Sequence, residues 1–318
     1  MTINYNFLNE KSTVYYYIYS NFLIPLRPIS KKLLETRTIV IYIEININVM
    51  YTDTIFWGVG TMKQLGNVFF VGAGPGDPKL ITVKGLECIQ SSDVIIYDRL
   101  ANPELLDYAG ANAEMIYCGK HPNHHYIEQT QINEIIIEKA LEGKTVTRLK
   151  GGDPCVFGRI QEELEGLKEL GVRYEIVPGI TAGIAAPAYA GISVTQRKVA
   201  TSFAMVAGHL CHGNSISEEK WKAYAVGIDT LAFYMGISNI TYICERLIEH
   251  GRDPHTPTAI ITWGTTADQR TLVGTLQNIP ELVREHEVLN PAIILVGEVV
   301  SMHDRLAWFK EQPVEIFS

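Results

Sequence analysis

Cysteine is scarce in this chain of 318 residues, and its distribution restricts the class of protein. The five cysteines are Cys88, Cys118, Cys155, Cys211 and Cys244, and no two of them form a CxxC pair. An odd number of scattered cysteines excludes a disulfide framework of the kind found in small secreted proteins. We therefore expect reduced thiols and a cytoplasmic protein.

Long apolar runs and excess positive charge are also missing. The most apolar run near the start, residues 13–26, is interrupted by Ser20 and Asn21 and is too short to span a bilayer. It does not follow a basic start or end in a small-residue cleavage site, as a signal peptide would. The net charge is −8 and the pI is about 5.6, which gives no basic footprint for nucleic acid. We expect neither a membrane nor a nucleic-acid partner, and an anionic ligand would have to be bound by local arginines.

The composition is otherwise that of a globular protein, with 47% apolar and 19% charged residues, and the length allows two domains. Residues 1–61 differ from the rest, being rich in Tyr, Ile and Asn, and Met62 stands just before the first convincing strand. We expect 1–61 to be an N-terminal extension, either disordered or the result of a wrongly assigned start. Residues 62–196 and 197–318 are predicted to form two α/β domains with a ligand cleft between them.

Apolar runs that suit buried strands alternate with helical patterns through both predicted domains. In the first, the expected strands are 68–71, 93–98, 114–117, 145–147 and 174–177, and helices are expected near 80–86, 132–140, 160–167 and 182–190. In the second, the expected strands are 202–207, 230–234, 258–262 and 292–296, with helices near 218–224 and 242–250.

The first strand leads into a glycine-rich loop that lacks one essential glycine. Gly72-Ala-Gly-Pro-Gly-Asp77 has Asp77 where the dinucleotide-binding fingerprint needs its third glycine, and Pro75 stiffens the loop. We therefore exclude the Rossmann fingerprint.

The stretch from Arg148 to Glu163 is central to the first domain, because it leads from a predicted strand through a loop rich in glycine and proline into a predicted helix. Its Gly151-Gly152-Asp153-Pro154 turn lets the backbone approach a ligand and leaves main-chain groups free to bond it. Arg159 and Glu162 are three residues apart and hence share one face at the helix start. The alternative is that the glycines serve only chain geometry and the glutamates only the helix dipole.

Asp98 falls where the second strand ends, the position from which open α/β sheets present working side chains. A turn cap before Pro103 is the alternative for this aspartate. Further along, residues 118–125 hold Lys120 together with a thiol and three histidines. Their spacing fits no common zinc pattern and Pro122 divides them, so we predict no metal site.

From Gly66 to Lys310 the chain resembles the tetrapyrrole methylase family, and within it the enzymes that methylate uroporphyrinogen III. The matching segments, specific by their order and spacing, are Val71–Pro78, Tyr97–Leu100, Gly119-Lys120, Arg148–Pro154, Phe157–Arg159, Val177–Thr181, Tyr189–Ile192 through Thr195 to Arg197, Tyr234–Gly236, Gly264-Thr265 and Pro291-Ala292.

The resemblance implies a homodimeric enzyme that moves two methyl groups from S-adenosylmethionine to carbons 2 and 7 of uroporphyrinogen III. The product, precorrin-2, serves sirohaem or cobalamin synthesis. Such enzymes bind the methyl donor between two α/β domains and not along a Rossmann loop. The donor contacts carried over are Pro75, Gly151, Gly152, Asp153, Val156, Thr181, Ala182, Met235 and Gly264.

The resemblance also implies roles at the acceptor. Asp98 would accept a proton and Lys120 would donate one. The acceptor carries eight carboxylates, so Arg159 and Arg197 are candidates to pair with them, with Glu162 beside Arg159. An arginine is a poor base at its usual pKa, which favours anchoring as the role of Arg159.

Two departures from the family pattern and two rival functions stay open. Ile160 and Gln161 stand where the family more often has two glycines, and Cys155 where it usually has an aromatic or aliphatic residue. Bulk beside Arg159 could narrow the acceptor pocket. The rivals are a sister methylase that acts on a later corrin precursor or another acceptor, and a donor-binding protein without catalysis.

Overall fold

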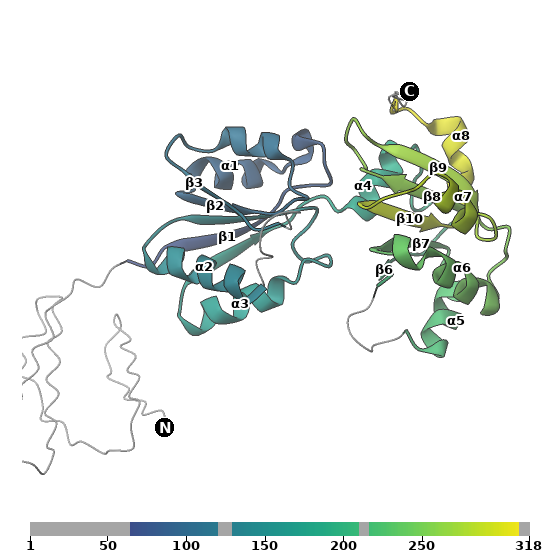
Figure 1. The fold of residues 1–318 in the computed structure, drawn as a ribbon, viewed down its shortest axis with the longest axis horizontal. Coiled ribbons are helices and arrows are strands. Elements are labelled where there is room, and N and C mark those ends of the chain that lie inside the picture. The colour runs from purple at the N-terminus through teal and green to yellow at the C-terminus, as the bar shows by residue number, and fades with distance from the viewer. Residues whose placement is uncertain (1–63, 120–128, 210–215, 312–318) are drawn as a thin grey trace, which may run out of the picture. The chain divides into compact units, whose positions relative to one another are not determined.

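The structure is a computed structural model that describes residues 64–119, 129–209 and 216–311. These residues form two α/β domains, each built on one five-stranded sheet (Figure 1). The predicted fold class is therefore confirmed. Within the described ranges, no helix is long and apolar enough to cross a membrane.

The first sheet is parallel throughout, with strand order β3-β2-β4-β1-β5. Its strands are β1 (Asn67–Gly72), β2 (Val94–Tyr97), β3 (Glu114–Tyr117), β4 (Val146–Lys150) and β5 (Arg173–Val177). Its helices are α1 (Val83–Ser91), α2 (Gln129–Leu141) and α3 (Ile160–Glu169), with short 3₁₀ helices η2 (Pro78–Leu80) and η3 (Pro103–Tyr108).

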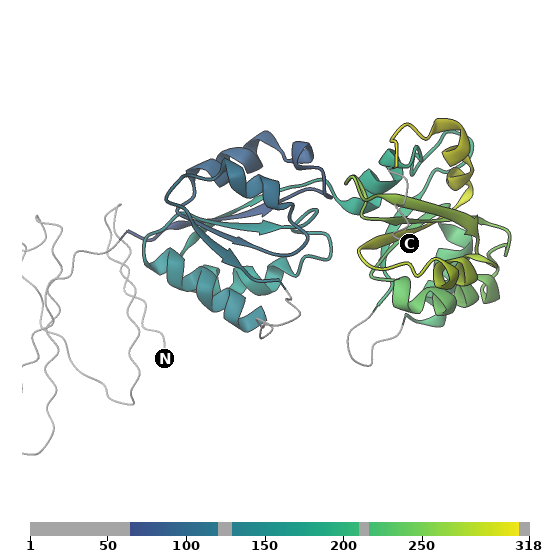
Figure 2. The same cartoon turned by 45° about the horizontal axis from the view of Figure 1, so that its top comes forward.

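Helices cover both faces of this sheet, as Figures 1 and 2 show from two directions. Val68 and Phe70 of β1 pack with Ile136 of α2 and Leu167 of α3 on one face. The other face packs against α1 and η3 through a cluster that includes Val71. Burial on both faces explains why β1 and β2 read as apolar runs in the sequence.

The second sheet is mixed, with order β6-β7-β10-β8-β9. Only the pair β6 and β7 is parallel, and the other three pairs are antiparallel. The strands are β6 (Phe203–Ala207), β7 (Thr230–Tyr234), β8 (Pro257–Thr262), β9 (Arg270–Thr275) and β10 (Ala292–Val296). The helices are α4 (Ala182–Tyr189), α5 (Glu218–Gly227), α6 (Ile240–Glu249), α7 (Ile279–Glu285) and α8 (His303–Leu306), with η4 (Ile237–Asn239) and η5 (Glu298–Met302).

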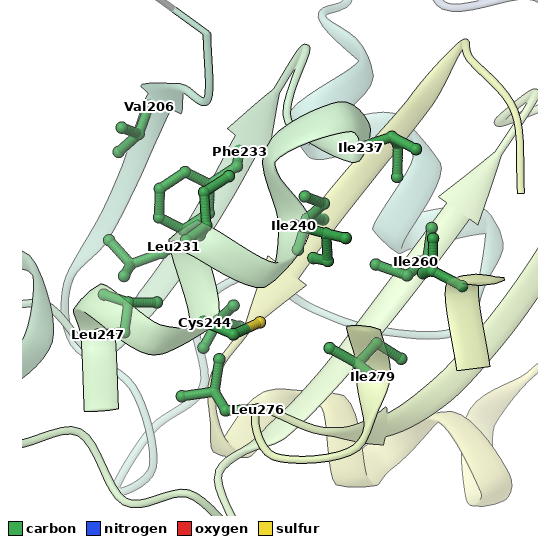
Figure 3. Close-up of a cluster of buried hydrophobic side chains, with 14 of the residues drawn as sticks. Val206, Leu231, Phe233, Ile237, Ile240, Cys244, Leu247, Ile260, Leu276 and Ile279 are labelled. Carbon is green, nitrogen blue, oxygen red and sulfur yellow. The ribbon is translucent and has the colours of Figure 1, made fainter. Parts of the chain in front are cut away.

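The larger core of the second domain lies between this sheet and helices α5, α6 and α7. Phe233 of β7, Leu247 of α6 and Ile279 of α7 are fully buried or nearly so in it (Figure 3). On the opposite face, Ala186 of α4 packs in a cluster with Leu295 of β10. Helix α4 therefore packs on the second sheet, although it precedes Arg197. The predicted division at residues 196 and 197 stays a prediction.

The strands and helices that the apolar pattern predicted are present, with bounds shifted by a few residues. Strand β9 and helix α7 were not predicted. The β9 sequence Arg-Thr-Leu-Val-Gly-Thr is partly buried at every position except Val273, which is exposed, so burial does not alternate along the strand. Helix α7 spans only seven residues and carries Pro280 in its first turn, so no long helical period marks it.

Candidate functional site

Three glycine-containing loops meet at the carboxyl edge of the first sheet, after β1, β4 and β5. The amide of Gly74 donates to the Gly152 carbonyl at 3.2 Å and the amide of Gly152 donates back to the Gly74 carbonyl at 2.7 Å. A Cβ placed on Gly179 would lie 2.3 Å from the Gly152 oxygen and 2.7 Å from Gly72 Cα. Only glycine permits backbones to approach so closely, which explains why glycine stands at the end of β1 and within two residues of the ends of β4 and β5.

The carboxylate of Asp153 ties two of these loops together. Its Oδ1 accepts a hydrogen bond from the Cys155 amide at 2.7 Å, and its Oδ2 accepts one from the Gly179 amide at 3.0 Å. Gly152 has φ +69, the left-handed region that glycine adopts without strain. The predicted donor-binding residues Gly151, Gly152 and Asp153 are thus held in one defined turn, with Val156 next to it and half-buried.

The loop that carries Pro75 is fixed from three directions. The Asn102 side chain donates to the Gly76 carbonyl at 2.7 Å, and the Asp77 amide donates to Thr265 Oγ1 at 2.9 Å. Tyr189 at the end of α4 donates its hydroxyl proton to Asp77 Oδ2 at 2.9 Å. Burial, together with this bond to Asp77, raises the pKa of Tyr189 to about 12. Asp77 stands where a dinucleotide-binding fingerprint would have glycine, and here its amide and carboxylate fix the loop in place.

Tyr234, at the end of β7, organises the start of α4. Its hydroxyl lies 2.6 Å from Thr181 Oγ1 and accepts a hydrogen bond from the Gly183 amide at 2.6 Å. Burial raises the pKa of Tyr234, although the bonds from Thr181 and Gly183 oppose that effect. The predicted donor contacts Thr181 and Ala182 are consequently fixed to the residue just before Met235.

The last two predicted donor contacts follow strands of the second sheet. Met235 follows β7 and its side chain is 48% exposed. Gly264 comes after β8, where an added Cβ would lie 2.4 Å from the Cβ of Ala186 in α4. Thr265 next to Gly264 makes the bond to Asp77 described above. Loops from both sheets therefore contact one another around the predicted donor contacts.

Backbone strain is concentrated in these same loops. Five non-glycine residues there have left-handed φ angles between +45 and +70, namely Phe157, Arg159, Met235, Trp263 and Thr265. Such conformations cost energy and persist where the surroundings determine them, often at ligand sites. The Phe157 ring also lies 4.9 Å from the Tyr234 ring, centroid to centroid. The strain is an observation independent of motif matching that points to these loops as functional.

Asp98 lies in the turn that follows β2, with its side chain 26% exposed. Its Oδ1 accepts a hydrogen bond from the Leu100 amide at 3.0 Å, which is the turn cap considered from the sequence. Its Oδ2 accepts a hydrogen bond from Arg148 Nη2 at 3.4 Å. A Cβ on Gly151 would lie 2.5 Å from Leu100 Cβ, so the Asp98 turn packs on the Gly151 turn. Asp98 and the glycine loops thus share one edge of the sheet.

A buried charge network that the sequence analysis missed lies beneath this edge. Arg148 and Lys150 alternate along β4 and so face the same side of the sheet. Glu163 Oε1 accepts hydrogen bonds from Lys150 Nζ at 2.8 Å and from Arg148 Nε at 3.4 Å. The Glu163 side chain is fully buried, and its Oε2 has no hydrogen-bond partner among the residues that the structure describes. Glu163 therefore does more than complement the helix dipole.

The charges in this network shift the pKa values of the two cations in opposite directions. Burial would lower the pKa of Arg148, but the negative charges of Glu163 and Asp98 outweigh it and raise that pKa. Burial and the positive charge of Arg148 lower the pKa of Lys150 despite the opposing effect of Glu163. Arg148 is consequently a permanent cation beside Asp98. The sequence signal for it was an arginine directly after the β-branched run of residues 145–147.

Arg159 and Glu162, whose spacing predicted that they share one face, form a bidentate ion pair at the start of α3. Arg159 Nε donates to Glu162 Oε1 at 2.8 Å, and Arg159 Nη2 donates to Glu162 Oε2 at 2.6 Å. The hydrogen bond from Arg159 lowers the pKa of Glu162. Both side chains are about half exposed, at 53% and 51%. An acceptor carboxylate that bound Arg159 would have to compete with Glu162.

One predicted site residue, Arg197, has no described contact with this group, and another, Lys120, cannot be placed. Arg197 is exposed in the turn closed by the Gln196 and Ala200 hydrogen bonds, and no contact among the described residues joins it to Asp98 or Arg159. Lys120 lies outside the described residues, as do the three histidines considered for a metal. In the ranges that the structure covers, no cluster of three or more His, Cys, Asp or Glu side chains could hold a metal ion.

Comparison with known proteins gives the family. The model of the tetrapyrrole (corrin/porphyrin) methylases matches residues 67–280. A uroporphyrinogen-III C-methyltransferase of Priestia megaterium is 56% identical over 237 residues, which cover 74% of this chain and 99% of the relative. One of Bacillus subtilis is 52% identical over 249 residues, or 78% of this chain, and the match spans about half (51%) of that longer relative.

A solved structure supports the same relationship. Uroporphyrin-III C-methyltransferase from Thermus thermophilus, complexed with S-adenosylhomocysteine, is 36% identical and superposes with a TM-score of 0.64. The superposition covers 74% of this chain and 99% of that one. Because the family model matches the chain from β1 into α7, more than half of its length, the chain belongs to the tetrapyrrole methylase family.

Proposed function

We propose that this chain is a methyltransferase that moves two methyl groups from S-adenosylmethionine to carbons 2 and 7 of uroporphyrinogen III, forming precorrin-2. The observation that carries the proposal is the 56% identity to the Priestia megaterium enzyme across 99% of that protein's length. The product would serve sirohaem or cobalamin synthesis.

The residues at the loop edge fit a bound methyl donor. A Cβ on Gly152 would meet only Thr181 Cα, at 3.8 Å, so the space in front of this glycine is open. Met235 is half-exposed, and Val156 is partly so, which provides apolar contact for a nucleoside. Pro75, Gly151, Gly152, Asp153, Val156, Thr181, Ala182, Met235 and Gly264 would hold the donor. When bound, S-adenosylmethionine supplies an electrophilic methyl group.

The protein's own contribution is to hold the acceptor carbon in line with that methyl group and to manage a proton. Attack on the methyl group makes the ring carbon quaternary and leaves that pyrrole ring positively charged, so the macrocycle must lose a proton from another position, which calls for a positioned base. Asp98 would accept the proton, held by the Leu100 amide and by Arg148. Lys120 would act as proton donor. Arg159 with Glu162, and Arg197, would bind acceptor carboxylates.

The proposed assembly is a homodimer, and the proposed compartment is the cytoplasm. Cys88, Cys118, Cys155 and Cys244 are all free thiols, which supports a reducing compartment. Neither nucleic acid nor a membrane is a proposed partner, in keeping with the net charge of −8.

The proposal is tested by incubating the full chain anaerobically with uroporphyrinogen III and S-adenosylmethionine and measuring the mass of the tetrapyrrole. Two added methyl groups are expected. Donor binding without any methylation of this acceptor, but with methylation of a later corrin precursor, would favour the sister-methylase rival. Donor binding without turnover on any acceptor would favour the non-catalytic rival.

A further inference from the structure

We propose that Arg99, supported by the ring of Trp263, is a further acceptor-binding residue that pairs with a carboxylate of the tetrapyrrole. This inference rests on the proposed function, because that function supplies an acceptor with many carboxylates. It concerns residues that the motif comparison left without a role.

The position of Arg99 places it beside the proposed chemistry. It directly follows Asp98 in the turn after β2, and its side chain is exposed. The backbone of this turn is fixed by the Leu100 amide bond to Asp98 Oδ1 and by the Ala101 amide bond to the Asp98 carbonyl at 3.2 Å. Because this backbone is fixed, the Arg99 side chain starts from a defined position next to the proposed base, Asp98.

Trp263 supports the guanidinium from the loop after β8. The Arg99 Cζ atom lies 5.9 Å from the centre of the Trp263 ring, within the range of a cation–π interaction. The Trp263 backbone is held in a left-handed conformation, φ +45, by the Trp263 amide bond to the Pro291 carbonyl at 3.0 Å and by Thr266 Oγ1 bonded to the Trp263 carbonyl at 2.8 Å. The Trp263 backbone is strained and its indole is 40% exposed, and both features cost free energy. A ligand that packed on the indole would offset this cost.

Arg99 differs from the other arginines near this edge of the sheet in having no carboxylate partner among the described residues. Arg148 is paired with Asp98 and Glu163, and Arg159 is paired with Glu162. In the part of the chain that the structure describes, Arg99 has no carboxylate within ion-pair distance. An arginine stacked on an aromatic face keeps its in-plane N–H donors for bidentate recognition of a carboxylate. The chain is acidic overall, so a local cation is what an anionic acceptor requires.

The test is steady-state kinetics with both substrates on the full-length Arg99→Gln, Arg99→Lys and Trp263→Leu variants. Arg99→Gln should raise the KM for uroporphyrinogen III roughly tenfold to a hundredfold, the effect of losing one charge-assisted pair. The KM for S-adenosylmethionine should change less than about twofold. Arg99→Lys should recover part of the loss, and Trp263→Leu should raise the same KM by a smaller factor. The matched control is Arg173→Gln. Arg173 is exposed and begins strand β5, so it lies at the edge of the first sheet opposite to the one that carries Arg99.

The outcomes separate this inference from the proposed function. An unchanged KM for the acceptor in Arg99→Gln, with wild-type protein active, would overturn the inference and leave the proposed function standing. An equal rise in both KM values would also overturn it, because that result means Arg99 only holds the two loops together. A wild-type protein that does not methylate uroporphyrinogen III would instead refute the proposed function.

Discussion

At the scale of single residues, the two carboxylate oxygens of Asp98 accept hydrogen bonds from different donors. One oxygen caps its own turn through the Leu100 amide, and the other lies 3.4 Å from Arg148 and remains partly exposed. Asn in place of Asp98 would keep a carbonyl oxygen for the cap but could not accept a proton. We expect Asp98→Asn to lower kcat by roughly a hundredfold or more and to leave donor affinity unchanged.

Single-turnover methylation and calorimetric titration of the donor would measure these two effects separately. Asp107→Asn, at an exposed aspartate of η3 with no side-chain bond among the described residues, should leave both unchanged. Full activity in Asp98→Asn would exclude Asp98 as the proton acceptor.

The two arginine–glutamate pairs of the stretch from Arg148 to Glu163 offer a matched comparison of buried and exposed charge. Arg148 is 5% exposed and its loss would strand Glu163 and Asp98, whereas Arg159 and Glu162 are each half in solvent. We expect Arg148→Met to lower the free energy of unfolding by about 3–5 kcal/mol. Arg159→Met should lower it by less than about 1 kcal/mol.

Urea unfolding at 25 °C measures both values. Equal losses for the two variants would contradict the expectation that removing the buried arginine costs more than removing the exposed one.

At the scale of elements, Tyr234 connects strand β7 to the first turn of α4. Removing its hydroxyl leaves the buried Thr181 hydroxyl and the Gly183 amide without this partner. We expect Tyr234→Phe to cost about 1–3 kcal/mol of stability. It should also raise the KM for S-adenosylmethionine several-fold, because Thr181, Ala182 and Met235 are all proposed donor contacts.

Thermal unfolding together with donor titration checks this expectation. Tyr224→Phe in α5, whose ring packs against Trp221, serves as the control for loss of a tyrosine hydroxyl. A Tyr234→Phe variant that binds the donor as tightly as wild type would contradict the proposed placement of α4 in the donor site.

Asp229, just before β7, joins the start of β6 to β7. Its Oδ2 accepts bonds from the amides of Thr201 and Ser202 at 2.7 and 2.9 Å and from both hydroxyls at 3.0 Å. These bonds hold the pKa of Asp229 at about 2, below the ordinary value of 3.8. A lowered folded-state pKa means that the stabilisation is present above pH about 3.8 and is lost as the pH falls toward 2.

We therefore expect Asp229→Asn to lower Tm by about 2–4 °C at pH 7, and this difference from wild type to shrink between pH 4 and pH 2. Calorimetry across that range is the measurement. A Tm difference that stays constant down to pH 2 would show that the carboxylate charge is not what holds the two strands.

Which elements were predictable from the sequence depends on their burial. The strands β1, β2 and β10 are buried on both faces, so their unbroken apolar runs identified them. Strand β9 pairs only with β8 at the sheet edge and mixes polar residues with a glycine, which leaves no such run. The antiparallel pairing of β10 with both β7 and β8 depends on long-range contacts that no local pattern records.

The candidate site shows the same limit. The spacing of Arg159 and Glu162 predicted that they share one face, because residues three apart along a helix lie on the same side of it. The bonds of Tyr189 to Asp77 and of Thr265 to Asp77 join residues 112 and 188 positions apart, which spacing cannot reveal. From the sequence, Glu163 was considered only as a complement to the helix dipole, and the structure shows it buried against Arg148 and Lys150.

At the scale of the whole molecule, loops from both sheets contact one another around the proposed donor contacts, and the charged residues lie at the carboxyl edge of the first sheet. The central claim is that this arrangement methylates two defined ring carbons of an octacarboxylate tetrapyrrole.

The most direct measurement is NMR of the tetrapyrrole formed anaerobically from uroporphyrinogen III and S-adenosylmethionine carrying a ¹³C-labelled methyl group. The account predicts two labelled methyl groups, one on carbon 2 and one on carbon 7. Label on any other carbon, or no label in the macrocycle although the protein binds the donor, would contradict it.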